Sequence, residues 1–147
     1  MSETATGIAA FFESYRAAFE RFDAAKIADH FAFPCHVTGD GEPIALLPVA
    51  DKASWVAQLE RLLGMYRAIG VSTARLAGLE VSELSPRLFQ AAVHWKLFDA
   101  QARPLYAFEA VYTLALVDDD RLRVAAIAHN EMPRYRECLG RLRPPSS

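Results

Sequence analysis

The sequence predicts an α+β domain in which helices from the first half of the chain pack on a bent antiparallel sheet formed by the second half. Up to Gly70, apolar residues recur every three or four positions, the period of amphipathic helices. From Val71 onward they alternate with polar residues between turn-forming residues, as in antiparallel strands. A length of 147 residues fits one compact domain over positions 1–147.

The first helix is indicated by an apolar stripe that runs from Ile8 to Phe22, so the helix should begin near Thr6. Asp23 is a favourable N-cap for a short second helix that carries Ile27 and Phe31. These two helices should present one apolar face to the sheet.

A hairpin and a long helix are expected next. The hairpin strands are residues 33–38 and 44–49, joined by a turn at 39–41. Asp51 is placed to cap the long helix, and Gly70 is placed to end it. Gly64 inside this helix would allow another backbone to approach closely, although simple tolerance of glycine is the more common explanation.

Four long strands are predicted after Val71, separated by turns near residues 85–86, 99–104 and 118–120. Gly78 indicates a bulge or bend in the first of them. The last strand should end near Glu131 and be followed by a short helical turn over 135–142. The tail from about residue 143 should fray.

The turns also predict the register of the neighbouring strands, that is, which residues lie opposite each other. This register assigns each side chain to one of the two faces of the sheet. It places His94 opposite Glu109 and Val111 opposite His129. The face expected to meet the helices is largely apolar and aromatic: Phe89, Val93, Trp95, Leu97, Phe108, Tyr112, Leu114, Leu116, Leu122, Val124 and Ala128. The opposite face is mixed: Gln90, Ala92, His94, Lys96, Ala107, Glu109, Thr113, Arg123, Ala125, Ile127, His129 and Glu131.

The mixed face has small residues at its centre, so it suits either solvent or the same sheet of a second subunit. Homodimers are the commonest closed assemblies. We therefore expect a homodimer that pairs through this open sheet face.

Composition excludes several classes of partner. Sixteen Lys and Arg against eighteen Asp and Glu give a net charge of -2, without the basic excess that nucleic-acid binding requires. No apolar run approaches the ~18 residues that span a bilayer, so no membrane insertion is expected. Residues 1–10 lack the features of a secretory signal, and Cys35 and Cys138 lack disulfide-framework or metal-site spacing, which predicts a cytoplasmic protein with reduced thiols.

Two segments carry a resemblance to a known family. One is Tyr15-Arg16-Ala17-Ala18-Phe19, followed by Asp23, Ile27 and Phe31. The other is Tyr112-Thr113-Leu114 with Asp120-Arg121-Leu122-Arg123-Val124, where Leu122 stands in place of the family's usual Trp. With the order of elements, these segments resemble the NTF2-like (cystatin-like, SnoaL-like) superfamily along nearly the whole chain.

The resemblance implies a cone enclosed between the bent sheet and the helices. Members of the superfamily include isomerases, dehydratases, polyketide cyclases, enzyme subunits and transport adaptors, so the fold does not specify the activity. Tyr15 lies where ketosteroid isomerases place their oxyanion-binding Tyr. Their general-base Asp would fall near Thr38 and Gly39, whereas the available acid here is Asp40 in the turn.

The first candidate site is the cone itself, for a small apolar or aromatic molecule. Its expected ligand-binding residues are Tyr15, Phe19, Trp55, Tyr66, Trp95 and Tyr112, with Asn130 near the mouth. The alternative is that these aromatic side chains simply fill the core.

The second candidate is His94 opposite Glu109, a pair that would act with Tyr15 if the protein is a catalyst. His129 and Glu131 are expected on the same outer face. A solvated or subunit-interface pair is the commoner role for such residues, and no close metal-ligand spacing occurs. We therefore predict no metal and no cofactor.

Three functions remain open from the sequence. The leading one is binding of a small, largely apolar molecule in the cone. The second is a cofactor-independent isomerase, dehydratase or cyclase in which Tyr15 stabilises an oxyanion and a His or Asp moves the proton. The third is a dimerisation or adaptor module whose cone is filled by its own side chains.

Overall fold

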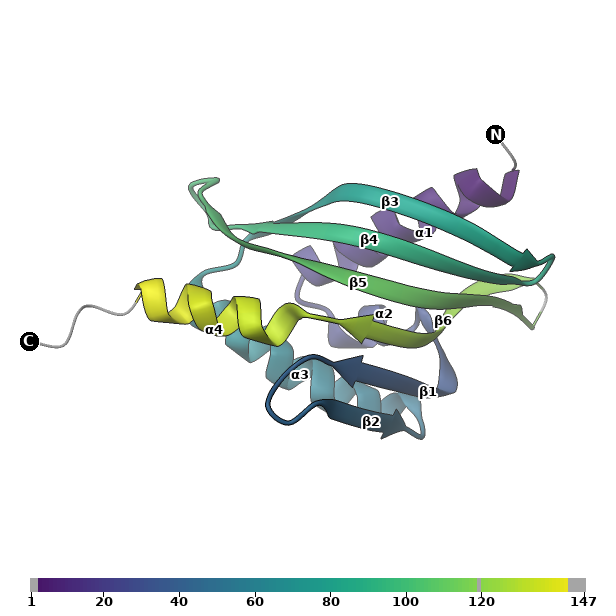
Figure 1. The fold of residues 1–147 in the computed structure, drawn as a ribbon, viewed down its shortest axis with the longest axis horizontal. Helices are drawn as coiled ribbons and strands as arrows, with labels where there is room; N and C mark the ends of the chain where they lie inside the picture. The colour runs from purple at the N-terminus through teal and green to yellow at the C-terminus, as the bar shows by residue number, and fades with distance from the viewer. Residues whose placement is uncertain (1–2, 119, 143–147) are drawn as a thin grey trace, which may run out of the picture.

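The computed structural model describes residues 3–118 and 120–142, and Figure 1 shows the arrangement of the elements. The tail expected to fray from about residue 143 lies outside these residues. The helices and strands follow in the order α1 (Glu3–Glu20), α2 (Ala24–Ala28), β1 (Phe31–Gly39), β2 (Ala45–Val49), α3 (Lys52–Ile69), β3 (Thr73–Ser85), β4 (Leu88–Phe98), β5 (Pro104–Val117), β6 (Arg121–His129) and α4 (Glu131–Leu142).

The six strands form one sheet in the order β2-β1-β6-β5-β4-β3. The four long strands pair antiparallel, as the sequence predicts. The β1–β2 hairpin also forms, but β1 joins the sheet beside β6 in a parallel pair, which the sequence did not indicate. The alternation of apolar and polar residues along a strand predicts which residues share a face of the sheet. It does not predict which strand a hairpin elsewhere in the chain will pair with.

Helices α1, α2 and α3 lie on one side of the curved sheet, and α4 continues from the end of β6 (Figure 1). The core between the layers is rich in aromatic residues. Phe12 packs edge-on against Tyr112 and Tyr15, with ring centroids 4.9 and 6.2 Å away. Tyr15 in turn contacts Phe19 at 5.1 Å, so the predicted stripe of α1 forms much of the helix–sheet interface.

The predicted N-caps of α2 and α3 and the predicted end of α3 are confirmed, but α2 ends at Ala28, so Phe31, expected on this helix, is the first residue of β1. Asp23 accepts a hydrogen bond from the Lys26 amide at 3.0 Å, and Asp51 accepts one from the Ser54 amide at 2.8 Å. Gly70 ends α3 with φ 80, a left-handed conformation that glycine adopts without strain. A Cβ on Gly64 would meet nothing within 4 Å, so Gly64 is not a site of close backbone approach.

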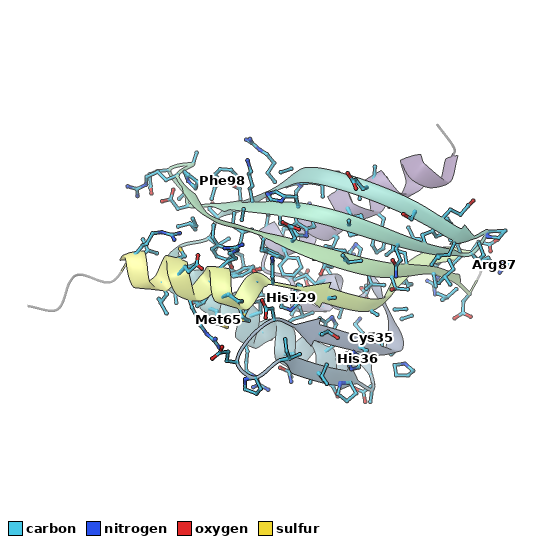
Figure 2. All side chains as sticks on the ribbon, in the orientation of Figure 1. Cys35, His36, Met65, Arg87, Phe98 and His129 are labelled. Carbon is cyan, nitrogen blue, oxygen red and sulfur yellow. The ribbon has the colours of Figure 1, made fainter. Side chains whose placement is uncertain are left out.

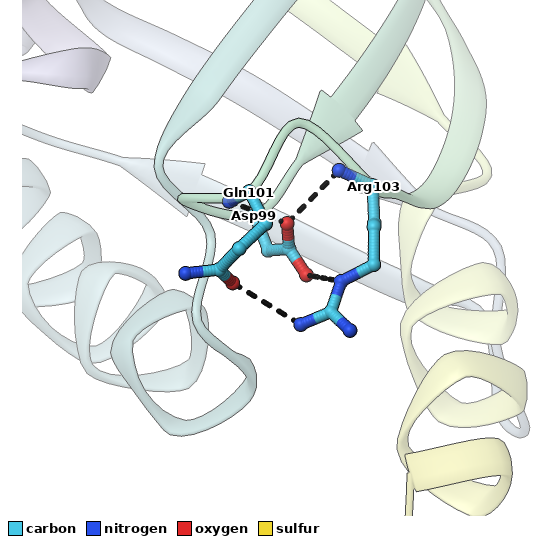
Figure 3. Close-up of polar contacts among 3 residues, drawn as sticks. All are labelled: Asp99, Gln101 and Arg103. Carbon is cyan, nitrogen blue, oxygen red and sulfur yellow. Dashed lines mark hydrogen bonds and ion pairs between the residues drawn. The ribbon is translucent and has the colours of Figure 1, made fainter.

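The turn between β4 and β5 is held by a short polar network (Figure 3). Oδ1 of Asp99 accepts from the amides of Gln101 and Arg103, each at 2.9 Å, and Oδ2 accepts from Arg103 Nε at 2.9 Å. The hydrogen bond from the Arg103 amide is the largest of the effects that lower the pKa of Asp99. This turn sets the predicted register beyond it, and His94 lies opposite Glu109 as expected.

The predicted β5–β6 register is wrong. Next to the turn the strands are already displaced by two residues, because Leu116 pairs with Leu122 and not with Val124 as the aspartate turn predicts. At Ala125 the pairing shifts by one residue, from Leu114 opposite Val124 to Thr113 opposite Ala126, and His129 lies opposite Ala110 instead of Val111. This β-bulge reverses the alternation in the second half of β6. Ile127 and His129 therefore face the helices, whereas Ala128, expected inside, is exposed.

The C-terminal segment also differs from its prediction. The expected short turn over 135–142 is a 12-residue helix that already begins at Glu131. Tyr135 of α4 donates a hydrogen bond to the Met65 carbonyl of α3 at 3.0 Å, which ties the two helices together. No helix in residues 3–118 and 120–142 is long and apolar enough to cross a membrane.

Candidate functional site

A cavity of about 80 Å³ lies between α1, α3 and the inner face of the sheet. Its walls come from every strand except β2 and from three of the helices, so residues far apart in sequence meet around it. Most of the lining side chains are aromatic or aliphatic. We call this space the cavity.

Six of the seven residues predicted to bind a ligand line the cavity: Tyr15, Phe19, Trp55, Tyr66, Trp95 and Tyr112. The periodicity of α1 and α3 turns four of these side chains toward the sheet, and the β4–β5 register places Trp95 and Tyr112 on the sheet face opposite them. Asn130 does not belong to this lining. Its Oδ1 instead accepts a hydrogen bond from the Glu109 amide at 2.8 Å, next to the end of β6. Whether the six residues hold a ligand stays a prediction.

The lining residues that remain partly exposed gather at the end of α1 and the start of β3, which places the opening there. Arg16 forms ion pairs with Glu13 at 3.0 Å and with Glu20 at 2.7 Å. Glu20 also accepts from the Ala74 amide at 2.9 Å. The charge of Arg16 at the opening is therefore compensated by neighbouring carboxylates.

A buried carboxyl marks another part of the cavity. Glu131, at the first position of α4, is 5% exposed. Its Oε2 accepts hydrogen bonds from the hydroxyls of Tyr66 at 2.5 Å and Tyr106 at 2.8 Å. Burial raises the pKa of Glu131 from 4.5 to about 7, and the two tyrosine hydrogen bonds oppose this rise.

His129 lies next to Glu131 and also lines the cavity; Figure 2 labels it at the end of β6. Its Nδ1 accepts a hydrogen bond from the Glu131 amide at 3.1 Å, which assigns the ring proton of the neutral form to Nε2. Burial lowers the pKa of His129, so the neutral imidazole is favoured. Its Nε2–H is therefore a hydrogen-bond donor on the cavity wall.

The ring of His129 needs the glycine at position 39 of β1. A Cβ on Gly39 would lie 3.2 Å from His129 Cε1 and 3.3 Å from Nε2. Such contacts are tighter than van der Waals packing allows without movement. The Gly39 predicted for a turn therefore lies at the end of β1, where it leaves room for this imidazole.

The tyrosines and tryptophans around the cavity remain neutral hydrogen-bonding groups. Burial raises the pKa values of Tyr15 and Tyr66 well above the usual range, and nearby tyrosine or glutamate groups add to the rise. Trp95 Nε1 donates to the Tyr112 hydroxyl at 2.9 Å. Trp55 Nε1 is buried and has no hydrogen-bond partner among the described residues.

The predicted pair His94 and Glu109 does not reach the cavity. The two residues are opposite each other on the outer face of β4 and β5, where His94 is half-buried and Glu109 is exposed. Tyr15 lies on the other side of the sheet, among the cavity residues. A site that combines Tyr15 with His94 and Glu109 is therefore wrong on geometry.

Glu131 and His129 are cavity residues that the sequence did not predict there, because the expected register placed both on the outer face. The available signal was the run Val124-Ala125-Ala126-Ile127-Ala128, five apolar residues in succession that interrupt the alternation of β6. In the described part of the chain, no group of three or more His, Cys, Asp or Glu residues could hold a metal ion.

The arrangement has the elements of a small-molecule site. Apolar walls provide binding free energy, and a few polar groups at fixed places orient a ligand. A carboxyl whose pKa is about 7 can also accept or donate a proton near neutral pH.

Comparison with protein families decides where the chain belongs. A family model described as "NTF2-like protein (DUF6841)" matches residues 2–132, nearly the whole chain. The chain belongs to this NTF2-like family. The resemblance inferred from the Tyr15 and Tyr112 segments is thereby confirmed, and so is the α+β fold.

Solved structures agree on the NTF2-like fold. Aln2 from a Streptomyces species is 14% identical, with a TM-score of 0.69 over 97% of this chain and 98% of that one. ActVI-ORFA from Streptomyces coelicolor is 15% identical, with a TM-score of 0.69 over 88% and 97%. A ketosteroid isomerase-like protein from Erwinia carotovora atroseptica is 15% identical, with a TM-score of 0.64 over 88% and 97%.

These identities are low, so the similarities establish the fold and leave the activity open. No curated protein matches the chain.

Proposed function

We propose that this NTF2-like protein binds a small, largely apolar molecule in the cavity. The observation that carries the proposal is the cavity itself: aromatic walls from α1, α3 and the sheet, with polar groups confined to a few positions. Its volume of about 80 Å³ is well below the ~300 Å³ at which ligand sites usually begin, as the adaptor alternative, a cone filled by its own side chains, expects. The ligand should therefore be compact.

The unpartnered Trp55 Nε1 also favours a ligand. Leaving a buried donor without an acceptor costs about 1–3 kcal/mol, and Trp55 is one of the residues around the cavity. A ligand that places an acceptor atom beside this indole would remove the cost.

Binding is tested by NMR titration of the ¹⁵N-labelled protein with compact neutral molecules such as cyclopentane and cyclopentanol. We expect shift changes that are largest at cavity residues and that saturate. The matched variant Ala110→Leu adds volume inside the cavity, because Ala110 is 2% exposed and lines it. A folded Ala110→Leu variant should lose the binding, and shift changes that persist in it would place the ligand elsewhere.

Catalysis is the second candidate function, and Glu131 is the observation that favours it. The acid that ketosteroid isomerases would place near Thr38 is absent here, and Asp40 is exposed. Glu131 offers a buried carboxyl in the same cavity as Tyr15. The test measures how fast small ketones exchange their α-hydrogens for deuterium in D₂O. Exchange faster than in buffer alone, and lost in Tyr15→Phe and Glu131→Gln, would establish catalysis. If the protein does not accelerate exchange, binding remains the function.

We also propose a homodimer through the outer face of the sheet. Val111 is 41% exposed and Leu88 is 38% exposed there, around the small exposed residues Ala92 and Ala128. Sedimentation at micromolar concentration should show a dimer that Val111→Glu dissociates. Ala57→Glu, a control that adds the same charge to the exposed surface of α3 on the opposite side of the sheet, should leave it intact. A monomeric wild type contradicts the dimer and favours a solvated face.

Both cysteines are buried, and we propose that their thiols are reduced. A cytoplasmic location is part of the proposal.

A further inference from the structure

Glu131 has no cationic partner among the described residues. It is the one charged residue in the buried class among those the structure describes, and its two recorded partners are the neutral hydroxyls of Tyr66 and Tyr106. None of the ion pairs in the described part of the chain includes it. A buried carboxylate is costly unless a positive charge and hydrogen bonds compensate it.

The hydrogen bonds already present are those of an ionised carboxyl. Both hydroxyls donate to the same oxygen, Oε2, and donors of this kind favour the charged form. The second oxygen, Oε1, receives no hydrogen bond from the described residues. Glu131 itself lines the cavity, so Oε1 is the acceptor left for a ligand.

The walls of the cavity suit a cation as well as an apolar body. Aromatic rings attract a positive charge to their faces, and Trp does so most strongly. The lining includes Tyr15, Phe19, Trp55, Trp95, Phe108 and Tyr112. Aromatic rings gathered around a carboxylate therefore provide the two kinds of contact that stabilise an ammonium group.

Other titratable groups near Glu131 leave its charge uncompensated. Tyr66 on α3, Tyr106 and Tyr112 on β5 and Tyr15 on α1 all have raised pKa values and stay neutral. His129 on β6 is favoured as the neutral form, and burial raises the pKa of Cys138 on α4. Arg16 on α1 lines the cavity but is paired with Glu13 and Glu20.

We propose that the ligand of this cavity carries a protonated amine on a compact apolar body, and that Glu131 is its counter-ion. The ammonium donates to Oε1 while the aromatic rings enclose the hydrocarbon part. This inference rests on the proposed function, since it names the ligand class of the same site.

The test compares amines with alcohols of the same shape by calorimetry near pH 8, where Glu131 is mostly ionised. Isopropylamine with isopropanol and cyclopentylamine with cyclopentanol are the matched pairs. In the wild type, the amine of at least one pair should bind about tenfold more tightly or better, because an ion pair outside bulk water is worth more than a neutral hydrogen bond.

Glu131→Gln keeps the shape of the side chain and removes its charge, so it should abolish the preference for the amine while retaining the alcohol. The control Glu109→Gln removes an exposed carboxylate from the outer sheet face and should leave the preference unchanged. If Glu131→Gln does not fold, the wild type alone still decides: affinity for the amine should rise between about pH 6 and 8, and affinity for the alcohol should not.

The outcomes separate the two proposals. Alcohols that bind as tightly as amines, or an amine preference that survives in folded Glu131→Gln, overturn the ammonium inference and leave the binding function standing. If neither amines, alcohols nor cyclopentane bind the wild type, both proposals fail.

Discussion

The hydroxyl of Tyr66 donates to Glu131 Oε2 at 2.5 Å and so joins the middle of the chain to the start of α4. The two residues are 65 positions apart in sequence. The same oxygen accepts from Tyr106 of β5, so three elements meet at one carboxyl. Because this carboxyl is buried at the cavity, its protonation should affect both the stability of the fold and the proposed binding of a ligand.

The stability of the protein should fall as Glu131 ionises. Burial raises its pKa from 4.5 in the unfolded chain to about 7 in the fold, so the folded state holds this proton more tightly. The contribution is fully present below pH 4.5 and is lost as the pH rises through about 7. Its size is about 3 kcal/mol if the pKa difference is fully expressed.

Urea unfolding of wild type and Glu131→Gln over this pH range isolates the effect. The variant should gain stability relative to the wild type as the pH rises, by up to about 3 kcal/mol. Other carboxyls, such as Asp29 with its lowered pKa, act in the opposite direction and cancel in the comparison. A stability difference that does not vary with pH would show that Glu131 titrates as an ordinary surface carboxyl.

Removing either tyrosine hydroxyl should raise the pKa of Glu131 further. Tyr66→Phe or Tyr106→Phe deletes a hydrogen bond that favours the carboxylate. At pH values above the pKa of Glu131, each substitution should lower the free energy of unfolding by about 1–3 kcal/mol. Tyr135→Phe is the matched control, because its hydroxyl donates to the Met65 carbonyl instead. NMR titration of the Glu131 carboxyl should show a higher midpoint in the first two variants only. Equal midpoints in all three variants would show that the Tyr66 and Tyr106 hydroxyls do not hydrogen-bond to Glu131.

Gly39→Ala should displace the ring of His129. The added Cβ would lie 3.2 Å from Cε1, so the imidazole has to move or the strands have to separate. We expect a loss of about 1–3 kcal/mol, typical of overpacking, and changed His129 ring signals in NMR spectra. An unchanged melting temperature together with unchanged ring signals would mean that the contact does not exist in solution.

Gly64→Ala should stabilise the protein, whereas Gly39→Ala should destabilise it. Position 64 is inside α3, and a Cβ there would meet nothing within 4 Å. Alanine should therefore stabilise the helix by up to about 1 kcal/mol. A lower melting temperature for Gly64→Ala would indicate a partner at this helix surface.

Much of the cavity wall could be predicted from the sequence because it depends on local periodicity. Tyr15 and Phe19 lie on the apolar stripe of α1, and Trp55 and Tyr66 lie on that of α3. The predicted pairing of His94 with Glu109 follows from the turn at Asp99, and it places the neighbouring residues Trp95 and Phe108 together on the inner face. In each case, residues close in sequence fix which way the side chain points.

The polar part of the site could not be predicted because it depends on one extra residue. The β-bulge at Ala125 carries neither Gly nor Pro, and it turns His129 to the inner face. The parallel pairing of β1 with β6 brings Gly39 beside His129, and this contact joins segments 90 positions apart. Such long-range placements leave no periodic pattern in the chain.

The protonation state of Glu131 underlies both the proposed ligand class and the predicted pH dependence of stability. ¹³C NMR of its side-chain carboxyl measures this state directly, with Glu131→Gln to assign the signal. We predict a midpoint near pH 7 in the ligand-free protein and a lower midpoint when cyclopentylamine is bound, because a cation favours the carboxylate. A midpoint near 4.5 that the amine leaves unchanged would contradict both the burial of this carboxyl and its role as a counter-ion.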